Sequence, residues 1–271
     1  MKKFEWKKGT PIFWEEFTWE EVEEYVEQCN MVIIPVGAIE QHGPHLPLST
    51  DTTQAMEISK RVSANTGVPL IPPVSVGISQ SHGNFPGTLW LRADTMIRVL
   101  YDLSTALYET GIRKFFFISG HMYNDWGIKS LRDHFRCDYD DVQITTVNYW
   151  LTAETRFAED CPQNKHIHGN FGETAQMLAI RPDLVKMDRA EDVPDFFTLF
   201  DYRFDQVSPN GIIGGNATGA TAEDGRLMLD AFEASITEMV LKGLAEKMPI
   251  PGGYQRKNKD LQVKKRRSWS N

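Results

Sequence analysis

Side chains that commonly bind metal ions crowd into one short loop of this 271-residue chain. The stretch VGAIEQHGPHLPLSTD, residues 36–51, holds Glu40, His42 and Asp51 among glycines and prolines. Glu40 and His42 are two residues apart, so in an extended segment their side chains lie on the same side, while Gln41 points away. A carboxylate and an imidazole placed in this way can bind one metal ion.

Two later segments carry residues of the same types. SGHMYND, residues 119–125, contains His121, and HIHGNFGETAQMLAI, residues 166–180, contains His168 and Glu173. These nitrogen and oxygen donors, without a thiolate, suit Zn²⁺, Mn²⁺ or Fe²⁺ better than Ca²⁺, which prefers oxygen alone. Two such ions close together can activate a water and polarise a carbonyl, which predicts hydrolysis. Histidines in glycine-rich loops also form purely structural hydrogen bonds, and spacing alone assigns no role to His45 or His82.

The remaining pattern predicts the elements that position these loops. Short apolar runs at 31–35, 114–119 and 142–150 predict buried strands, and helical periodicity predicts helices over 18–29, 51–67, 94–111, 124–136 and 222–247. This alternation indicates an α/β fold, a three-layer αβα sandwich around a mostly parallel sheet. The loops with His42 and His121 each follow a strand, so both are expected at the carboxyl edge of the sheet, where sites form.

Composition narrows the partners and the compartment. The net charge of −8 disfavours nucleic acid and anionic membranes and favours a small-molecule substrate. Three cysteines without a CxxC spacing, no signal-like start and no apolar run of about 18 residues predict a cytoplasmic protein. We expect one catalytic domain over 1–250, followed by a basic tail over 251–271 that holds seven Lys or Arg and one Asp.

Four motifs, in this order, resemble the creatininase family of metal-dependent amidohydrolases: GAIEQHGPHLPLSTD, HGNFPGTLWL, ISGHMYND and HGNFGETAQMLAI. The resemblance implies two divalent ions per chain (Zn, Mn or Fe) and a homo-oligomer, a hexamer built from smaller oligomers. By motif position it implies the metal ligands Glu40, His42, Asp51, His121 and Glu173, with Asp51 as the bridge. It also implies that His168 donates or accepts a proton beside the substrate.

The chain departs from the family pattern directly after His121. Many members have glycines where this chain has Met122 and Tyr123. In the creatinine-cleaving members a metal-binding glutamate takes the place of Tyr123, so Glu173 is expected to supply the fifth ligand here. We expect Tyr123, Asp125 and His82 to contact the substrate.

The resulting hypothesis is a hydrolase in which a two-metal-activated water cleaves an amide C–N bond of a small, polar, cyclic substrate. Two alternatives stay open. Tyr123 and Asp125 would also suit a polyhydroxylated substrate, which favours ring-opening hydrolysis of a C–C bond in an oxidised inositol. A metal-binding scaffold without catalysis is the other alternative.

Overall fold

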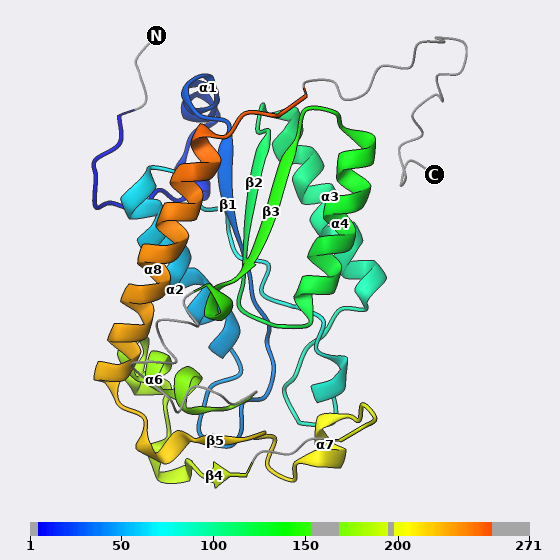
Figure 1. Cartoon of the computed structure of the whole chain (residues 1–271), viewed down its shortest axis with the longest axis vertical. Coiled ribbons are helices and arrows are strands. Elements are labelled where there is room, and N and C mark those ends of the chain that lie inside the picture. Colours follow the sequence, from blue (N-terminus) through cyan, green and yellow to red (C-terminus); the bar gives the residue numbers. More distant parts are fainter. Residues whose placement is uncertain (1–4, 153–167, 195–197, 251–271) are drawn as a thin grey trace.

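The computed structural model describes residues 5–152, 168–194 and 198–250 (Figure 1). Its parallel sheet has the order β1-β2-β3, formed by β1 (Met31–Val36), β2 (Lys114–Ser119) and β3 (Gln143–Asn148). One face carries α2 (Thr50–Thr66), α6 (Phe171–Ile180) and α8 (Ala222–Ala245), and the other carries α3 (Ala93–Glu109) and α4 (Asn124–Asp138). The predicted αβα sandwich is confirmed.

Smaller elements surround this framework. Helix α1 spans Trp19–Gln28 and α7 spans Phe204–Val207, while β4 (Asp192–Val193) and β5 (Gly215–Asn216) form an antiparallel pair. Single 3-10 turns occupy Trp14–Glu16, Gln80–His82, Tyr149–Leu151, Pro182–Leu184, Met187–Arg189 and Ala217–Gly219. Across the three described ranges, no helix is both long enough and apolar enough to span a bilayer.

The apolar runs in β1 and β2 are continuous because both faces of the sheet are buried. Successive side chains of a strand point to opposite faces. Ile33 and Phe116 therefore lie in the core that α2 and α8 share, whereas Val32 and Phe115 lie in the core beneath α3 and α4. These residues are at most 2 % exposed, so the two cores fix the sheet between its helical layers.

Most predicted boundaries agree with the structure. Thr18 is the N-cap of α1 and forms the expected capping box with Glu21, and Gly67, in the left-handed conformation, is the C-cap of α2. The strand predicted over 142–150 was wrong at its end, because Tyr149 starts a 3-10 turn. Tyr149 is buried and donates its hydroxyl hydrogen to the side-chain oxygen of Gln54, a contact that turns the chain away from the strand direction.

The strand register places the loops that follow β1 and β2 at the same edge of the sheet. Val36 pairs with Ser119, and Ser119 pairs with Asn148, so the three strands end side by side. The chain then passes very close to the start of α2: a Cβ on Gly120 would lie 2.3 Å from the backbone oxygen of Asp51. Only glycine permits this approach, which places His121 next to Asp51.

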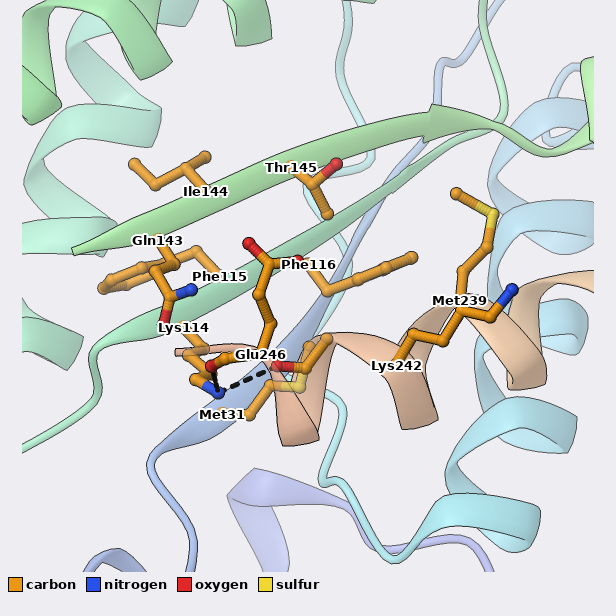
Figure 2. Close-up of a pocket in the computed structure, with 11 residues that line it drawn as sticks. Met31, Lys114, Phe115, Phe116, Gln143, Ile144, Thr145, Met239, Lys242 and Glu246 are labelled. Carbon is orange, nitrogen blue, oxygen red and sulfur yellow. Dashed lines mark hydrogen bonds between the residues drawn. The ribbon is translucent and has the colours of Figure 1, made fainter. Parts of the chain in front are cut away.

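At the opposite end of the sheet, Lys114 fastens the C-terminus of α8 to β2 (Figure 2). Its ammonium group donates to the backbone oxygens of Gly243, Leu244 and Glu246, each at 2.8 Å. The last carbonyls of a helix lack partners within the helix, and they carry partial negative charge. Lys114, on the neighbouring strand β2, gives these carbonyls hydrogen-bond donors and a compensating positive charge.

Replacing Lys114 with methionine should lower the free energy of unfolding by about 2 kcal/mol, because charge-assisted hydrogen bonds are lost and the carbonyls are left without a partner. Urea unfolding measures this change. Lys242→Met is the matched control on α8, since Lys242 is 74 % exposed and, among the residues that the structure describes, forms an ion pair with Glu238 alone. We expect the control to change stability by less than about 0.5 kcal/mol. Equal changes in the free energy of unfolding in both variants would show that the three carbonyl contacts do not stabilise the fold.

Helices α6 and α8 pack closely at Gly225. A Cβ at this position would lie 2.0 Å from the backbone oxygen of Ala175, so Gly225→Ala must push the two helices apart. We expect a loss of about 3 kcal/mol, at the upper end for overpacking. Gly243→Ala is the control in the same helix, because among the described residues its Cβ would meet the flexible end of Met31 alone, at 3.2 Å. That variant should keep or gain stability through helix propensity, and thermal unfolding compares the two.

Candidate functional site

A buried cluster of histidines and carboxylates lies beyond the ends of β1 and β2. It contains three overlapping groups, and within each group one donor atom per residue lies within 4.8 Å of the others. The groups are Glu40, His42 and His168; Glu40, Asp51 and His121; and His42, Asp51 and Glu173. The structure thus brings together all five residues expected as metal ligands, and His168 with them.

Asp51 occupies the centre of the cluster. It lies in the first turn of α2, as predicted, and is 2 % exposed. One carboxylate oxygen, Oδ1, is 2.9 Å from His42 Nε2, and the other, Oδ2, is 3.3 Å from His121 Nδ1. Because its two oxygens face two different imidazoles, Asp51 is placed to serve two ions at once.

Backbone carbonyls decide which nitrogen each of these imidazoles presents. His42 Nδ1 lies 3.0 Å from the backbone oxygen of Glu40, and His121 Nε2 lies 3.0 Å from that of Ile78. A carbonyl oxygen only accepts, so both of these ring nitrogens carry a proton and donate. The opposite nitrogens, His42 Nε2 and His121 Nδ1, point toward Asp51, so they are the nitrogens that can exchange a proton for a metal ion, as in metal-binding histidines.

Glu173 combines a helix cap with a position at the cluster. In the capping box of α6 its Oε2 accepts from the backbone N–H groups of Gly169 and Asn170, at 2.6 and 3.2 Å. Its Oε1 lies 3.6 Å from His42 Nε2. The cap therefore holds the second oxygen of Glu173 at the edge of the cluster.

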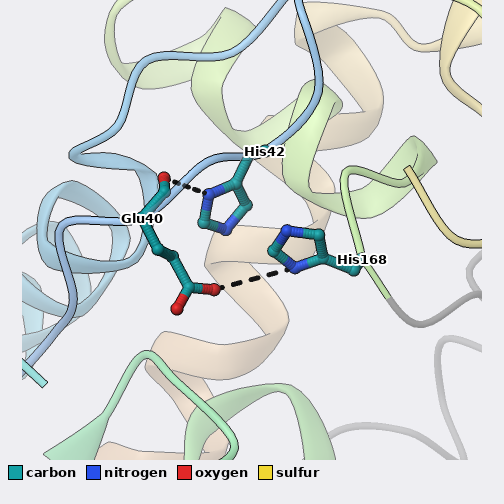
Figure 3. Close-up of side chains that lie close together, drawn as sticks. All are labelled: Glu40, His42 and His168. Carbon is teal, nitrogen blue, oxygen red and sulfur yellow. Dashed lines mark hydrogen bonds and ion pairs between the residues drawn. The ribbon is translucent and has the colours of Figure 1, made fainter. Parts of the chain in front are cut away.

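Glu40 is fully buried, and one of its carboxylate oxygens points toward the ring of His168 (Figure 3). Oε1 is 3.6 Å from His82 Nε2 and 3.8 Å from His168 Nδ1, and Oε2 is 3.2 Å from His121 Nε2. Within the described residues neither oxygen accepts a hydrogen bond, and the same holds for Asp51 Oδ2. Buried carboxylate oxygens without hydrogen bonds are costly unless a cation compensates them, so this donor set fits divalent metal ions.

The electrostatics of the cluster agree with that fit. Burial lowers the pKa of His121, but the carboxylates of Glu40 and Asp51 outweigh burial and raise this pKa to about 10. In the same way, Asp51 and Glu173 outweigh burial and raise the pKa of His42 above its ordinary value. A proton and a metal ion compete for the same lone pair, so imidazoles that attract a proton this strongly are suited to a metal ion.

His82 and His168 behave differently. Burial and the neighbouring His121 and His42 lower the pKa of His82 to about 2. Burial, His42 and His82 lower the pKa of His168 to about 3. Both rings are therefore neutral at pH 7, and a bound cation would lower their pKa values further.

Two residues of this region had not been expected at the site. Phe204, on α7, stacks on the ring of His82 with 3.7 Å between centroids and meets His168 edge-on at 4.9 Å. No motif surrounds Phe204 in the sequence, so nothing marked it. The amide nitrogen of Gln41 lies 3.0 Å from both His82 and His168. The alternation along the sequence did not indicate these neighbours.

The residues expected to contact the substrate have different surroundings. His82 lies beside the cluster, with Nε2 3.6 Å from Glu40 Oε1, and the ring of Tyr123 packs edge-on against His121 with 5.5 Å between centroids. Asp125 instead forms an ion pair with Lys129 one turn along α4, at 2.5 Å. Of the two bulky residues after His121, Met122 is half exposed, whereas Tyr123 contacts the ring of His121.

Comparisons with known proteins give a consistent result. A family profile described as creatininase, creatinine amidohydrolase, matches residues 15–240, which include every residue of the cluster. A creatinine amidohydrolase of Pseudomonas putida is 29% identical over 251 residues, covering 84% of this chain and 96% of that protein. A 3-dehydro-scyllo-inosose hydrolase of Thermotoga maritima is 23% identical over 275 residues, covering 90% of this chain and 88% of that protein. A solved structure described as creatininase Mn superimposes with a TM-score of 0.78 at 27% identity, covering 87% of this chain and all of that one.

Proposed function

Because this chain belongs to the creatininase family of metal-dependent hydrolases, we propose that it uses two divalent metal ions to hydrolyse an amide C–N bond in a small, polar, cyclic substrate. One observation carries the proposal. Asp51 lies between His42 and His121 and belongs to two groups of possible ligands that share no other residue. This arrangement supports a pair of ions bridged by one carboxylate, which is the centre that a two-metal hydrolase requires.

The residues that would hold the ions follow from these groups. Glu40, Asp51 and His121 would hold one ion, and His42, Asp51 and Glu173 would hold the other, with Zn, Mn or Fe as suitable metals. Bound there, the ions would lower the pKa of a water molecule and polarise the carbonyl of the substrate.

His168 and the aromatic residues beside the cluster would transfer the proton and border the substrate. His168 directs Nδ1 toward the cluster, 3.8 Å from Glu40 Oε1, where it can take a proton from the nucleophile and return it to the leaving nitrogen. Phe204 shields His82 and His168 on one side. Tyr123 covers His121 on another, so we assign the substrate to the space that these aromatic rings border.

A second candidate keeps the site and changes the bond. Tyr123 places a phenol beside His121, where a polyhydroxylated ring could hydrogen-bond to it. The similarity to an inosose hydrolase supports the same direction. In this reaction water would add a hydroxyl group to a ring carbonyl carbon and a proton to the departing carbon, which opens the ring.

Elemental analysis by inductively coupled plasma mass spectrometry tests the proposal, on the purified wild type and on His121→Ala. We expect about two Zn, Mn or Fe per chain, and fewer in the variant. A panel of creatinine and other lactams, formamides and oxidised inositols then identifies the bond that is cleaved. Turnover of inositols alone would favour the second candidate, and metal without any turnover would indicate a scaffold. A protein that binds no metal even after reconstitution would contradict the proposal.

A further inference from the structure

The side chain of Gln41 is buried between two imidazoles, and its orientation is determined by backbone groups. The amide oxygen accepts from the N–H of Gly43 at 2.9 Å, and the amide nitrogen donates to the backbone oxygen of Gly211 at 3.0 Å. A backbone N–H can only donate and a backbone carbonyl can only accept. The two ends of the amide are therefore identified without reference to either histidine.

The backbone of Gln41 fixes the proton of His168. His168 Nε2 lies 2.6 Å from the backbone oxygen of Gln41, which can only accept, so this nitrogen carries the proton. His168 Nδ1 then has a free lone pair, and it faces Glu40 Oε1 at 3.8 Å. The amide nitrogen of Gln41, although 3.0 Å from His168 Nε2, cannot donate to a nitrogen that is already protonated.

The side chain of Gln41 fixes the proton of His82. Its amide nitrogen has two hydrogens, and the first is used by Gly211. With His168 Nε2 excluded, the acceptor that remains for the second among the described residues is His82 Nδ1 at 3.0 Å. His82 therefore carries its proton on Nε2, which faces Glu40 Oε1 at 3.6 Å, and the stacked ring of Phe204 hinders a flip of this imidazole.

We propose that Gln41 is a positioning residue for the hydrolytic reaction, because it makes His168 present a lone pair and His82 present an N–H group to the same oxygen of Glu40. This inference rests on the proposed function. With opposite characters on the two rings, His168 can accept a proton from the nucleophile. His82 can donate a hydrogen bond to a carboxylate or to a substrate oxygen. Neither ring has to exchange its tautomer during turnover.

The tautomers can be observed directly. Long-range ¹H–¹⁵N spectra of the zinc-loaded, ¹⁵N-histidine-labelled protein distinguish the two neutral forms, and spectra of His82→Gln and His168→Gln assign the signals. In the wild type we expect both rings to be protonated on Nε2. In Gln41→Met the backbone carbonyl remains, so His168 should keep its tautomer, whereas His82 should become a mixture.

Kinetics supply the second readout. Gln41→Met should lower kcat about 10- to 100-fold, as expected for a residue that orients groups at a metal centre, with bound metal retained and KM changed less than about threefold. Gln176→Met is the matched control, since Gln176 is a buried glutamine that donates within α6 to the backbone oxygen of Gly172. This control should leave kcat and both tautomers unchanged.

A wild-type spectrum with the His82 proton on Nδ1 would overturn the inference, and so would an unchanged His82 signal and kcat in Gln41→Met. The wild-type spectrum gives this answer even if the variant does not fold. Absence of turnover on the whole substrate panel would count against the proposed function instead, and the spectra would still decide the hydrogen-bond assignment.

Discussion

Asp51→Asn is expected to lose both metal ions and at least about a thousandfold in kcat, since a two-metal centre supplies several kcal/mol of transition-state stabilisation. The reason is the position of Asp51 between two imidazoles, 2.9 Å from His42 and 3.3 Å from His121. Asparagine is neutral and keeps only one oxygen, so it cannot bind two cations as the carboxylate does. Elemental analysis and steady-state kinetics measure the two effects.

Asp94→Asn is the control for this variant. Asp94 also lies in the first turn of a helix, α3, but it is exposed and pairs with Arg92. We expect its metal content and kcat to equal those of the wild type. Loss of a single ion in Asp51→Asn would show that Asp51 serves one site and does not bridge.

His168→Ala should lower kcat by about 10² to 10⁴ while both metal ions stay bound, which is the range for losing a general acid or base. His168 is the neutral imidazole whose Nδ1 faces Glu40, and its ring lies 4.3 Å from that of His42. Kinetics on the best panel substrate, together with elemental analysis, test this expectation. His134→Ala, on α4, is the control and should behave as the wild type.

Two results would change the assignment of His168. Full activity with metal bound would exclude it from proton transfer. Loss of one ion together with activity would make His168 a metal ligand, a role that its group with Glu40 and His42 also permits.

The sequence could predict that Glu40, His42, Asp51, His121 and Glu173 lie close together, because their signals are local. His42 and His121 follow apolar strands, Asp51 starts a helix, and Glu173 stands three residues after the N-cap Asn170. A parallel sheet places such positions at one edge, so local patterns suffice to bring them together. The same holds for the sandwich itself, whose buried strands and capped helices are visible as short apolar runs and periodic segments.

The residues that escaped prediction depend on contacts between distant segments. Gln41 stands between Glu40 and His42 in the sequence, but the residues that its side chain contacts, His82, His168 and Gly211, belong to three other parts of the chain. Phe204 belongs to a helix of four residues that no periodicity could indicate. The end of β3 was missed for a similar reason, because Tyr149 turns toward Gln54 on α2.

The expected basic tail, 251–271, lies outside the described residues.

The cap of α6 has a thermodynamic consequence for metal uptake. Glu173 is held by two backbone N–H groups through one oxygen, so its rotamer is already restricted when the other oxygen binds an ion. Immobilising a free glutamate side chain costs up to about 2 kcal/mol of conformational entropy. This entropy is lost when α6 folds, so its loss does not weaken the binding of the metal ion. We therefore expect the side chain of Glu173 to be in its metal-binding conformation before a metal ion binds, so that binding does not have to order it.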